Sequence, residues 1–158
     1  MHKTGIGQDS HRFEKKGAKK RLVLGGVNIR GCPGLLGNSD ADVVLHALTN
    51  AISGISGMNI LGETSDTMCR EKGITDSAQY VKAALQTLGK LKITHVSIAI
   101  EGKRPVLSPF MAPMKKSIAK LLRIRAQDVG ITATSGEGLT AFGRGEGLQA
   151  FAIVSVEG

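Results

Sequence analysis

Aromatic residues are scarce in this sequence. Only 3% of its 158 residues are aromatic, with no tryptophan, one tyrosine and four phenylalanines, although 41% of the residues are hydrophobic. The core must therefore be built from aliphatic side chains and methionine. The length is that of one domain, and this hydrophobic content is sufficient for one buried core. We therefore expect a single domain over residues 1–158.

Paired cysteines and long apolar runs are also missing. The two cysteines, Cys32 and Cys69, have no CxxC partner, which indicates neither a disulfide framework nor a cysteine zinc site. No apolar run approaches the ~20 residues that a membrane span needs, and residues 1–4 lead directly into structured sequence. These absences predict a cytoplasmic protein without a membrane partner.

Positive charge, in contrast, is in excess. The formal net charge is +8, and part of the excess is local, in Lys15, Lys16, Lys19, Lys20 and Arg21. Such clusters occur in proteins that bind nucleic acid. Between two strand-like segments, however, they are more often solvated hairpin loops, and a basic chain also suits an anionic small substrate. A non-catalytic protein that binds nucleic acid through residues 15–21 therefore stands as one alternative.

The hydrophobic pattern predicts five strands. Residues 3–13 and 21–29 alternate as two strands joined by the basic turn, and three further strands are expected over residues 93–100, 128–135 and 147–156. His95 then lies on the outward side of its strand. No Rossmann glycine motif is present among these strands, which favours an α+β fold with a mixed or antiparallel sheet.

About three helices are expected to pack on one face of that sheet. The side chains of residues 38–40 offer caps for a first helix over residues 43–55, and Thr75 offers a cap for a second that ends near residue 88. A third begins at Ser108 or Pro109. Residues 54–73 contain four glycines and no clear period, which predicts a long loop.

Three side chains are spaced for a metal site. Asp9 and His11 are two residues apart in a strand, so both emerge on the same face. His46 lies on the first helix, with Asp42 one turn before it and Asn50 one turn after. Three N/O ligands with a fourth position free are typical of a catalytic zinc ion. The alternatives are a chance pair on an exposed strand and a core histidine.

Asp42 and the glycine-rich segment near residue 134 are further candidates. Asp42 is a candidate partner that orients a zinc ligand, or simply an acidic residue in the first turn of the helix. Thr134 and Ser135 stand at a strand end and run into glycine-rich backbone, which is suited to phosphate oxygens, and Glu137 is suited to a bridging magnesium ion. The alternative for this segment is a glycine-rich β-hairpin.

Taken together, three sequence blocks are similar to the 2-C-methyl-D-erythritol 2,4-cyclodiphosphate synthase family. They are residues 5–13 (GIGQDSHRF), residues 38–42 followed by His46-Ala47, and residues 134–137 ahead of 143–147 (GRGEG). The resemblance covers nearly the whole chain. It implies a homotrimer of α+β subunits with active sites between neighbours. It also implies the non-mevalonate reaction in which 4-diphosphocytidyl-2-C-methyl-D-erythritol 2-phosphate forms a cyclic diphosphate and releases CMP.

The resemblance also implies roles for individual residues. Zinc, or manganese, is bound by Asp9, His11 and His46, and a magnesium ion by Glu137. The implied catalytic residues are Asn38, Ser135 and Glu137. The implied substrate-binding residues are Asp9, Ser10, His11, Asn38, Ser39, Gly62, Thr134, Ser135, Gly136, Glu137 and Arg144. Arg144 and Glu146 also match positions that line a cavity on the trimer axis.

Several positions depart from the family pattern on the nucleotide side. Asn38 stands where the family has histidine, and residues 59–62 (NILG) lack the aspartate that holds the ribose. Residues 65–67 (SDT) replace a longer acidic loop, and Val106 replaces a lysine. These changes imply an altered cytidine pocket and weaker CDP affinity. A divergent metal-dependent phosphotransferase or phosphodiesterase on the same scaffold is the second alternative.

Overall fold

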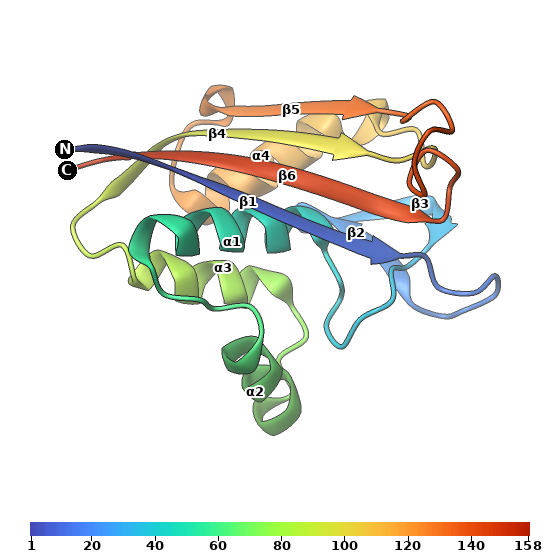
Figure 1. The fold of residues 1–158 in the computed structure, drawn as a ribbon, viewed down its shortest axis with the longest axis horizontal. Coiled ribbons are helices and arrows are strands. Elements are labelled where there is room, and N and C mark those ends of the chain that lie inside the picture. The colour runs from blue at the N-terminus through green and yellow to red at the C-terminus, as the bar shows by residue number, and fades with distance from the viewer.

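The structure is a computed structural model that describes residues 1–158. Its largest element is a four-stranded β-sheet (Figure 1). Its strand order is β1 (His2–Arg12), β6 (Gly147–Glu157), β4 (Lys92–Glu101) and β5 (Val129–Thr134). β6 pairs antiparallel with both β1 and β4, whereas β4 and β5 run parallel. The sheet is therefore mixed, as predicted, and the α+β fold class is confirmed.

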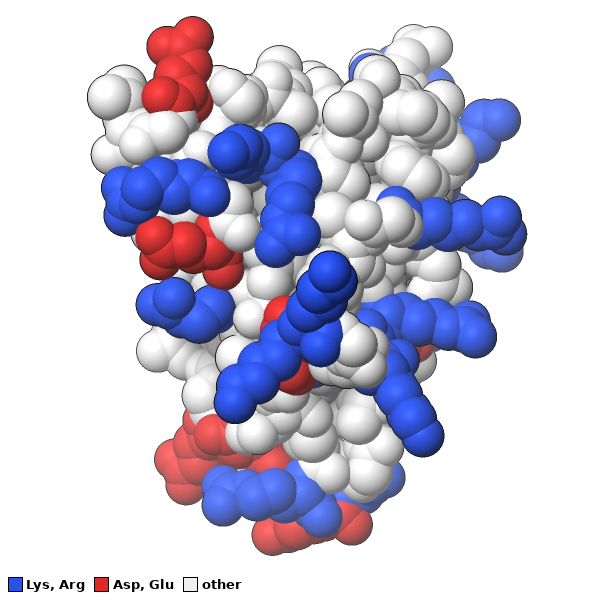
Figure 2. Space-filling model, turned by 90° about the vertical axis from the view of Figure 1, so that its right-hand side faces the viewer, with Lys and Arg blue, Asp and Glu red and all other residues white.

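The segment expected as a single second strand is a separate hairpin. β2 (Arg21–Leu24) and β3 (Val27–Pro33) pair antiparallel, and Gly25 and Gly26 form the turn with φ of 58° and 77°. Only glycine adopts two consecutive positive φ values at no steric cost, so the hairpin follows from this pair. The predicted pairing of β1 with residues 21–29 is wrong, because β1 pairs with β6. The end of the molecule that carries the basic segment is rich in Lys and Arg side chains (Figure 2).

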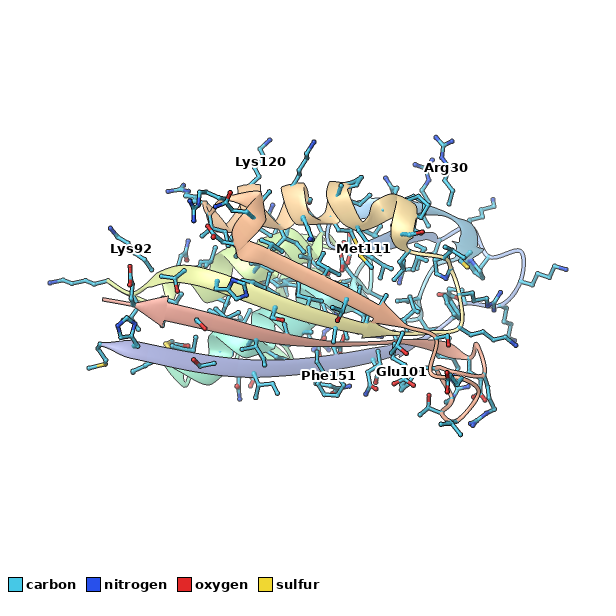
Figure 3. The ribbon with its side chains drawn as sticks, turned by 90° about the horizontal axis from the view of Figure 1, so that it is seen from above. Arg30, Lys92, Glu101, Met111, Lys120 and Phe151 are labelled. Carbon is cyan, nitrogen blue, oxygen red and sulfur yellow. The ribbon has the colours of Figure 1, made fainter.

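Helices cover one face of the four-stranded sheet. α1 (Val43–Ser56) packs on β1 and β6, α4 (Met111–Leu122) packs on β5, and α3 (Ser77–Gln86) packs on α1. β6 is buried at every second residue from Leu148 to Val156, which is the period of a strand with one covered face. Phe151 projects from the opposite, open face (Figure 3).

The structure contains four α-helices instead of about three. α2 (Glu63–Lys72) occupies part of the segment predicted to be a loop. Its sequence has no apolar stripe, and Ser65 is its only buried residue. The helix is defined at its ends instead. Ser65 accepts a hydrogen bond from the N–H of Gly62 at 3.1 Å, and Gly73 ends the helix in the left-handed conformation.

The N-terminal caps of α1 and α3 both lie later in the sequence than predicted. Asp76, not Thr75, caps α3 and accepts from the N–H of Ala78. Asp42, not residues 38–40, caps α1 and accepts from the N–H groups of Val44 and Leu45 at 3.1 and 3.0 Å. In the third predicted helix, Ser108–Phe110 form a 3-10 turn before α4 begins.

Asp42 also ties α1 to the β2–β3 turn. Its carboxylate accepts from the N–H groups of Gly25 at 2.9 Å and Gly26 at 2.7 Å, and it is completely buried. Burial raises the pKa of Asp42 to about 6, against the lowering effect of the hydrogen bonds from Leu45 and Gly26. The carboxylate is therefore ionised at pH 7, and the predicted role of orienting a metal ligand is wrong because all four donors are backbone N–H groups.

Replacing Asp42 by asparagine should lower the free energy of unfolding by about 1–2 kcal/mol. The amide keeps the size of the side chain but turns one acceptor oxygen into an NH2 group, which then faces a backbone N–H group that has no other partner. Urea unfolding at pH 7 measures the change. Asp76→Asn is the matched control, because this exposed cap accepts one hydrogen bond. An equal and negligible effect of both changes would contradict this account.

No helix combines the length and the apolar character required to cross a bilayer. The outward position predicted for His95 is confirmed, since it is exposed between the buried Ile93 and Val96.

Candidate metal centre

Asp9, His11 and His46 come together near the end of β1. Asp9 Oδ2 lies 2.9 Å from His11 Nε2 and 3.0 Å from His46 Nδ1, and the two ring nitrogens are 3.3 Å apart. The three possible ligand atoms lie within 4.8 Å of one another. The predicted convergence is confirmed, and a set of two imidazole nitrogens and one carboxylate can bind a divalent metal ion.

Two glycines allow this convergence. A Cβ on Gly7 would lie 2.0 Å from the carbonyl oxygen of Ala47, and one on Gly5 would lie 2.1 Å from that of Ala51. α1 therefore packs directly against the backbone of β1, which brings His46 beside the side chains of Asp9 and His11.

Opposite charges hold Asp9, His11 and His46 together. Burial raises the pKa of Asp9, but hydrogen bonds and charge interactions with His11 and His46 outweigh it and lower the pKa to about 2. Burial lowers the pKa of His11, but Asp9 raises it by more, so that it lies above 6.5. Asp9 is therefore ionised over the whole physiological range, and proton competition for a metal falls on His11, whose pKa is raised.

The pH dependence of metal binding should follow from these shifts. We expect zinc affinity to fall about tenfold per pH unit below the raised pKa of His11, because His11 must lose its proton to bind a metal. Asp9 contributes to this loss only as the pH approaches about 2. The same two pKa shifts also make the folding stability of the protein without zinc depend on pH, in opposite directions. The raised His11 pKa contributes stability that is lost as the pH rises through it, and the lowered Asp9 pKa contributes stability that is lost between pH 3.8 and about 2.

Zinc titration against a competing chelator at several pH values measures this dependence. An affinity that stays constant between pH 8 and pH 5 would show that His11 is not a ligand.

A cavity of about 310 Å³ opens beside the cluster. Six of the predicted site residues line it, and Leu61, Ser65 and Asp66 come from the segments in which the sequence departs from the family pattern. The predicted residues are Asp9, His11, Asn38, Ser39, Gly62 and His46; the others include Leu61, Ser65, Asp66, Cys69 and Tyr80. Sequence reasoning missed Cys69 on α2 and Tyr80 on α3. The one local signal near them was the cap predicted at Thr75 for the helix that carries Tyr80.

The other predicted site residues lie elsewhere. Ser10 points to the opposite side of β1 from Asp9 and is exposed. Thr134, Ser135, Gly136 and Glu137 belong to the end of β5 and the loop that follows it, and none of them lines the metal cavity.

The loop after β5 has the backbone conformation of a tight turn. Gly136, Glu137 and Gly138 all have positive φ, at 73°, 49° and 75°. The N–H of Glu137 donates to Ser135 Oγ at 3.2 Å, and the Glu137 side chain is exposed. Arg144, further along, pairs with Glu146 at 3.1 Å. The segment thus presents hydroxyl, carboxylate and backbone N–H groups to solvent.

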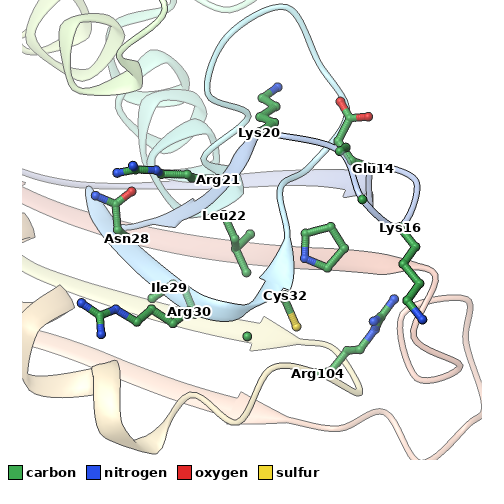
Figure 4. Close-up of a pocket in the computed structure, with 14 residues that line it drawn as sticks. Glu14, Lys16, Lys20, Arg21, Leu22, Asn28, Ile29, Arg30, Cys32 and Arg104 are labelled. Atoms are coloured by element: carbon green, nitrogen blue, oxygen red, sulfur yellow. The ribbon is translucent and has the colours of Figure 1, made fainter.

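The basic segment lines a different and larger cavity of about 1030 Å³ (Figure 4). Its cationic side chains include Lys16, Lys20, Arg21, Arg30 and Arg104, none of which forms an ion pair. Burial lowers the pKa of Lys20, whose Nζ donates to the Gly37 carbonyl at 2.9 Å. The one group of possible metal ligands, Asp9, His11 and His46, lies at the smaller cavity and not at this one.

Known proteins resemble this chain over nearly its whole length. Residues 2–157 match the family model described as the YgbB family. A relative from Chlamydia muridarum, 2-C-methyl-D-erythritol 2,4-cyclodiphosphate synthase, is 48% identical over 157 residues, which are 99% of this chain and 88% of the relative.

Solved structures agree with this match. The bifunctional IspDF from Campylobacter jejuni has a TM-score of 0.88 at 30% identity over 99% of this chain, which spans 42% of that protein. A 2C-methyl-D-erythritol-2,4-cyclodiphosphate synthase in its CDP-bound form has a TM-score of 0.83 at 28% identity, covering 98% of this chain and all of that one (100%). The fold, the group of possible metal ligands and the sequence agree, and the chain belongs to the YgbB family.

Proposed function

We propose that this chain converts 4-diphosphocytidyl-2-C-methyl-D-erythritol 2-phosphate into 2-C-methyl-D-erythritol 2,4-cyclodiphosphate and CMP. An oxygen of the 2-phosphate bonds to the β-phosphorus, and the bond from that phosphorus to the bridging oxygen breaks, so CMP leaves with the electron pair. The observation that carries the proposal is the Asp9–His11–His46 cluster beside a cavity, in a chain 48% identical to a named synthase. Release of CMP from this substrate tests it.

The cluster fits zinc or manganese. One carboxylate oxygen faces two imidazole nitrogens at 2.9 and 3.0 Å, a set that leaves a coordination position for substrate. When bound, the ion supplies a Lewis acid that polarises a phosphate oxygen. Asp9 contributes a negative charge at any pH above about 2, which favours retention of the cation. Glu137 is proposed to hold a magnesium ion with the substrate diphosphate.

The substrate is proposed to be held by two groups of residues. Asp9, His11, Asn38, Ser39 and Gly62 form the first group, which lines the cavity beside the metal site, and Ser10 is proposed to contact substrate from the opposite side of β1. Thr134, Ser135, Gly136, Glu137 and Arg144 form the second, in which the loop after β5 provides hydroxyl and backbone donors for phosphate. Asn38, Ser135 and Glu137 are proposed to act on the reacting phosphates, with donors from the first two and a metal-binding carboxylate from the last.

A complete site then requires a second copy of the chain, because the second group does not line the metal cavity. We propose a homotrimer with sites between neighbours. The open face of the sheet supports it, since Ile6, Phe151 and Ile153 remain 66%, 42% and 42% exposed, and Ile6 pairs directly with Ile153. Contiguous exposed apolar side chains of this size mark interfaces. Light scattering on the purified protein should give the mass of three chains.

The cytidine pocket should bind CDP more weakly than a pocket with the ribose-binding aspartate. Asn59 is exposed just after α1 and offers a neutral amide where that carboxylate is expected. Asn59→Asp should strengthen CDP binding by about 5- to 20-fold, because a hydrogen bond to an ionised acceptor is roughly twice as strong as a neutral one. Calorimetric titration with CDP and magnesium measures this, and Asn28→Asp on β3 is the control. Unchanged or weaker binding by Asn59→Asp would contradict the assignment.

The two alternatives are less well supported. A divergent phosphotransferase or phosphodiesterase, and a nucleic-acid-binding protein that uses residues 15–21, both leave the full-length similarity to named synthases unexplained. We propose a small-molecule substrate in the cytoplasm and no nucleic-acid partner.

A further inference from the structure

We propose that Asp40 and Ser77 are positioning residues that determine which ring nitrogen of His46 is free to bind a metal. His46 Nδ1 faces Asp9, and the other nitrogen, Nε2, lies 2.8 Å from Ser77 Oγ. Ser77 Oγ in turn contacts Asp40 Oδ1 in a short hydrogen bond. Asp40, Ser77 and His46 thus form a hydrogen-bonded chain that leads to the candidate metal site. The inference rests on the proposed metal site.

The positions of the protons in this hydrogen-bonded chain follow from which of its groups can donate and which can only accept. Both oxygens of Asp40 accept hydrogen bonds from backbone N–H groups, so Asp40 acts as an acceptor and the single hydroxyl proton of Ser77 points to it. Ser77 Oγ then has only lone pairs left for His46. The proton between Ser77 and His46 must therefore be on Nε2, and a neutral ring with its proton there has its lone pair on Nδ1. That is the nitrogen 3.0 Å from Asp9 and 3.3 Å from His11.

Backbone hydrogen bonds fix Asp40, the end of this chain that lies away from His46. Asp40 Oδ1 also accepts from the N–H of Asp42 at 3.0 Å, and Oδ2 accepts from the N–H of Ser77 at 3.1 Å. The N–H of Asp40 donates to the carbonyl of Thr75 at 2.9 Å. Ser77 is completely buried at the first turn of α3. The loop before α1 and the start of α3 are thus joined at the point where His46 is oriented.

One other hydroxyl approaches the same nitrogen, but less closely. Ser39 Oγ lies 3.3 Å from His46 Nε2 and already accepts from the N–H of Ala41 at 3.0 Å. Ser39 has no carboxylate partner that directs its proton, so it does not select a tautomer of the ring. Loss of Ser77 should therefore weaken metal binding without abolishing it.

Zinc affinity tests the inference directly. Ser77→Ala should bind zinc about 10- to 100-fold more weakly than the unmodified protein in a competition titration with a chelator. Ser53→Ala is the matched control, since this serine is buried on α1 and its hydroxyl has no hydrogen-bond partner. The control should bind zinc normally. Equal zinc affinity of Ser77→Ala and the unmodified protein would overturn the proposal.

A second measurement follows the Nε2 proton of His46 in the zinc-loaded protein. ¹⁵N NMR of labelled histidine should show His46 bound through Nδ1 and protonated on Nε2, with a proton that the contact with Ser77 Oγ protects from exchange with solvent. In Ser77→Ala this proton should exchange faster. A zinc ion bound through Nε2, or the absence of an Nε2 proton in the unmodified protein, would overturn the proposal even if Ser77→Ala does not fold.

Failure of this inference is distinguishable from failure of the proposed function. If the unmodified protein binds no zinc, or binds it equally well without His46, the proposed metal site is wrong. If zinc binding requires His46 but neither the affinity nor the exchange of the His46 Nε2 proton depends on Ser77, only the positioning role is wrong.

Discussion

Replacing His46 by alanine should leave the protein without bound zinc and slow CMP release by about 1000-fold or more. His46 supplies one of only three ligand atoms in the cluster, and no other histidine, cysteine or carboxylate belongs to it. Two remaining ligands do not compensate for the loss of an imidazole. Metal analysis of the purified variant and chromatography of its reaction mixture measure the two effects.

His95→Ala is the control for this experiment. His95 is exposed on β4 and takes no part in the metal cluster, so its removal should change neither zinc content nor rate. A His46→Ala protein that folds, lacks zinc and still releases CMP at the normal rate would contradict a role of the metal in the reaction.

Replacing Gly7 by alanine should lower the free energy of unfolding by about 3 kcal/mol or more. The added Cβ would lie 2.0 Å from the Ala47 carbonyl oxygen and 2.3 Å from the Ala51 nitrogen. Both are backbone atoms of α1, so no side chain can rotate away and the helix must move from the strand. Because His46 is on that helix, zinc affinity should fall together with stability.

Gly54→Ala provides the matched control for Gly7→Ala. Gly54 is exposed on the same helix, and its added Cβ would make only one ordinary contact, 3.6 Å from the Ile6 carbonyl. Alanine is the better helix former, so this variant should be stabilised by about 0.5–1 kcal/mol. Urea unfolding compares the two variants. Equal stability of Gly7→Ala and the unmodified protein would show that α1 does not pack this closely on β1.

The candidate metal site could be predicted from sequence because the placement of two of its three residues depends only on local geometry. Asp9 and His11 share a face of β1 through the period of a strand, and this needs no knowledge of the rest of the fold. The approach of His46 depends on the packing of α1 against Gly5 and Gly7. The sequence shows the two glycines but not that a helix lies on them, so the family resemblance was needed to join the two segments.

Strand pairing and α2 could not be predicted for a related reason. β1 pairs with β6, which is more than 130 residues away in sequence, and local alternation does not specify a distant partner. α2 has no apolar stripe for a periodicity search to find, since only Ser65 is buried. The β2–β3 hairpin was predictable from the Gly25-Gly26 pair, which is a turn signal.

The caps show how tertiary contacts choose between neighbouring polar residues. Residues 38–42 contain four side chains that are able to cap a helix. Asp42 does so because its carboxylate also meets the N–H groups of Gly25 and Gly26, whereas Asp40 accepts hydrogen bonds from Ser77. The connection of Asp40 through Ser77 to His46 joins segments that lie 37 and 31 residues apart, which no sequence pattern reveals.

The most direct test of the proposed function is incubation of the zinc-loaded protein with 4-diphosphocytidyl-2-C-methyl-D-erythritol 2-phosphate and magnesium. CMP is measured by chromatography, and the phosphorus products by ³¹P NMR. We expect CMP and a cyclic diphosphate in equal amounts, and neither product from His46→Ala. A trimeric protein with bound zinc that releases no CMP would contradict the assignment.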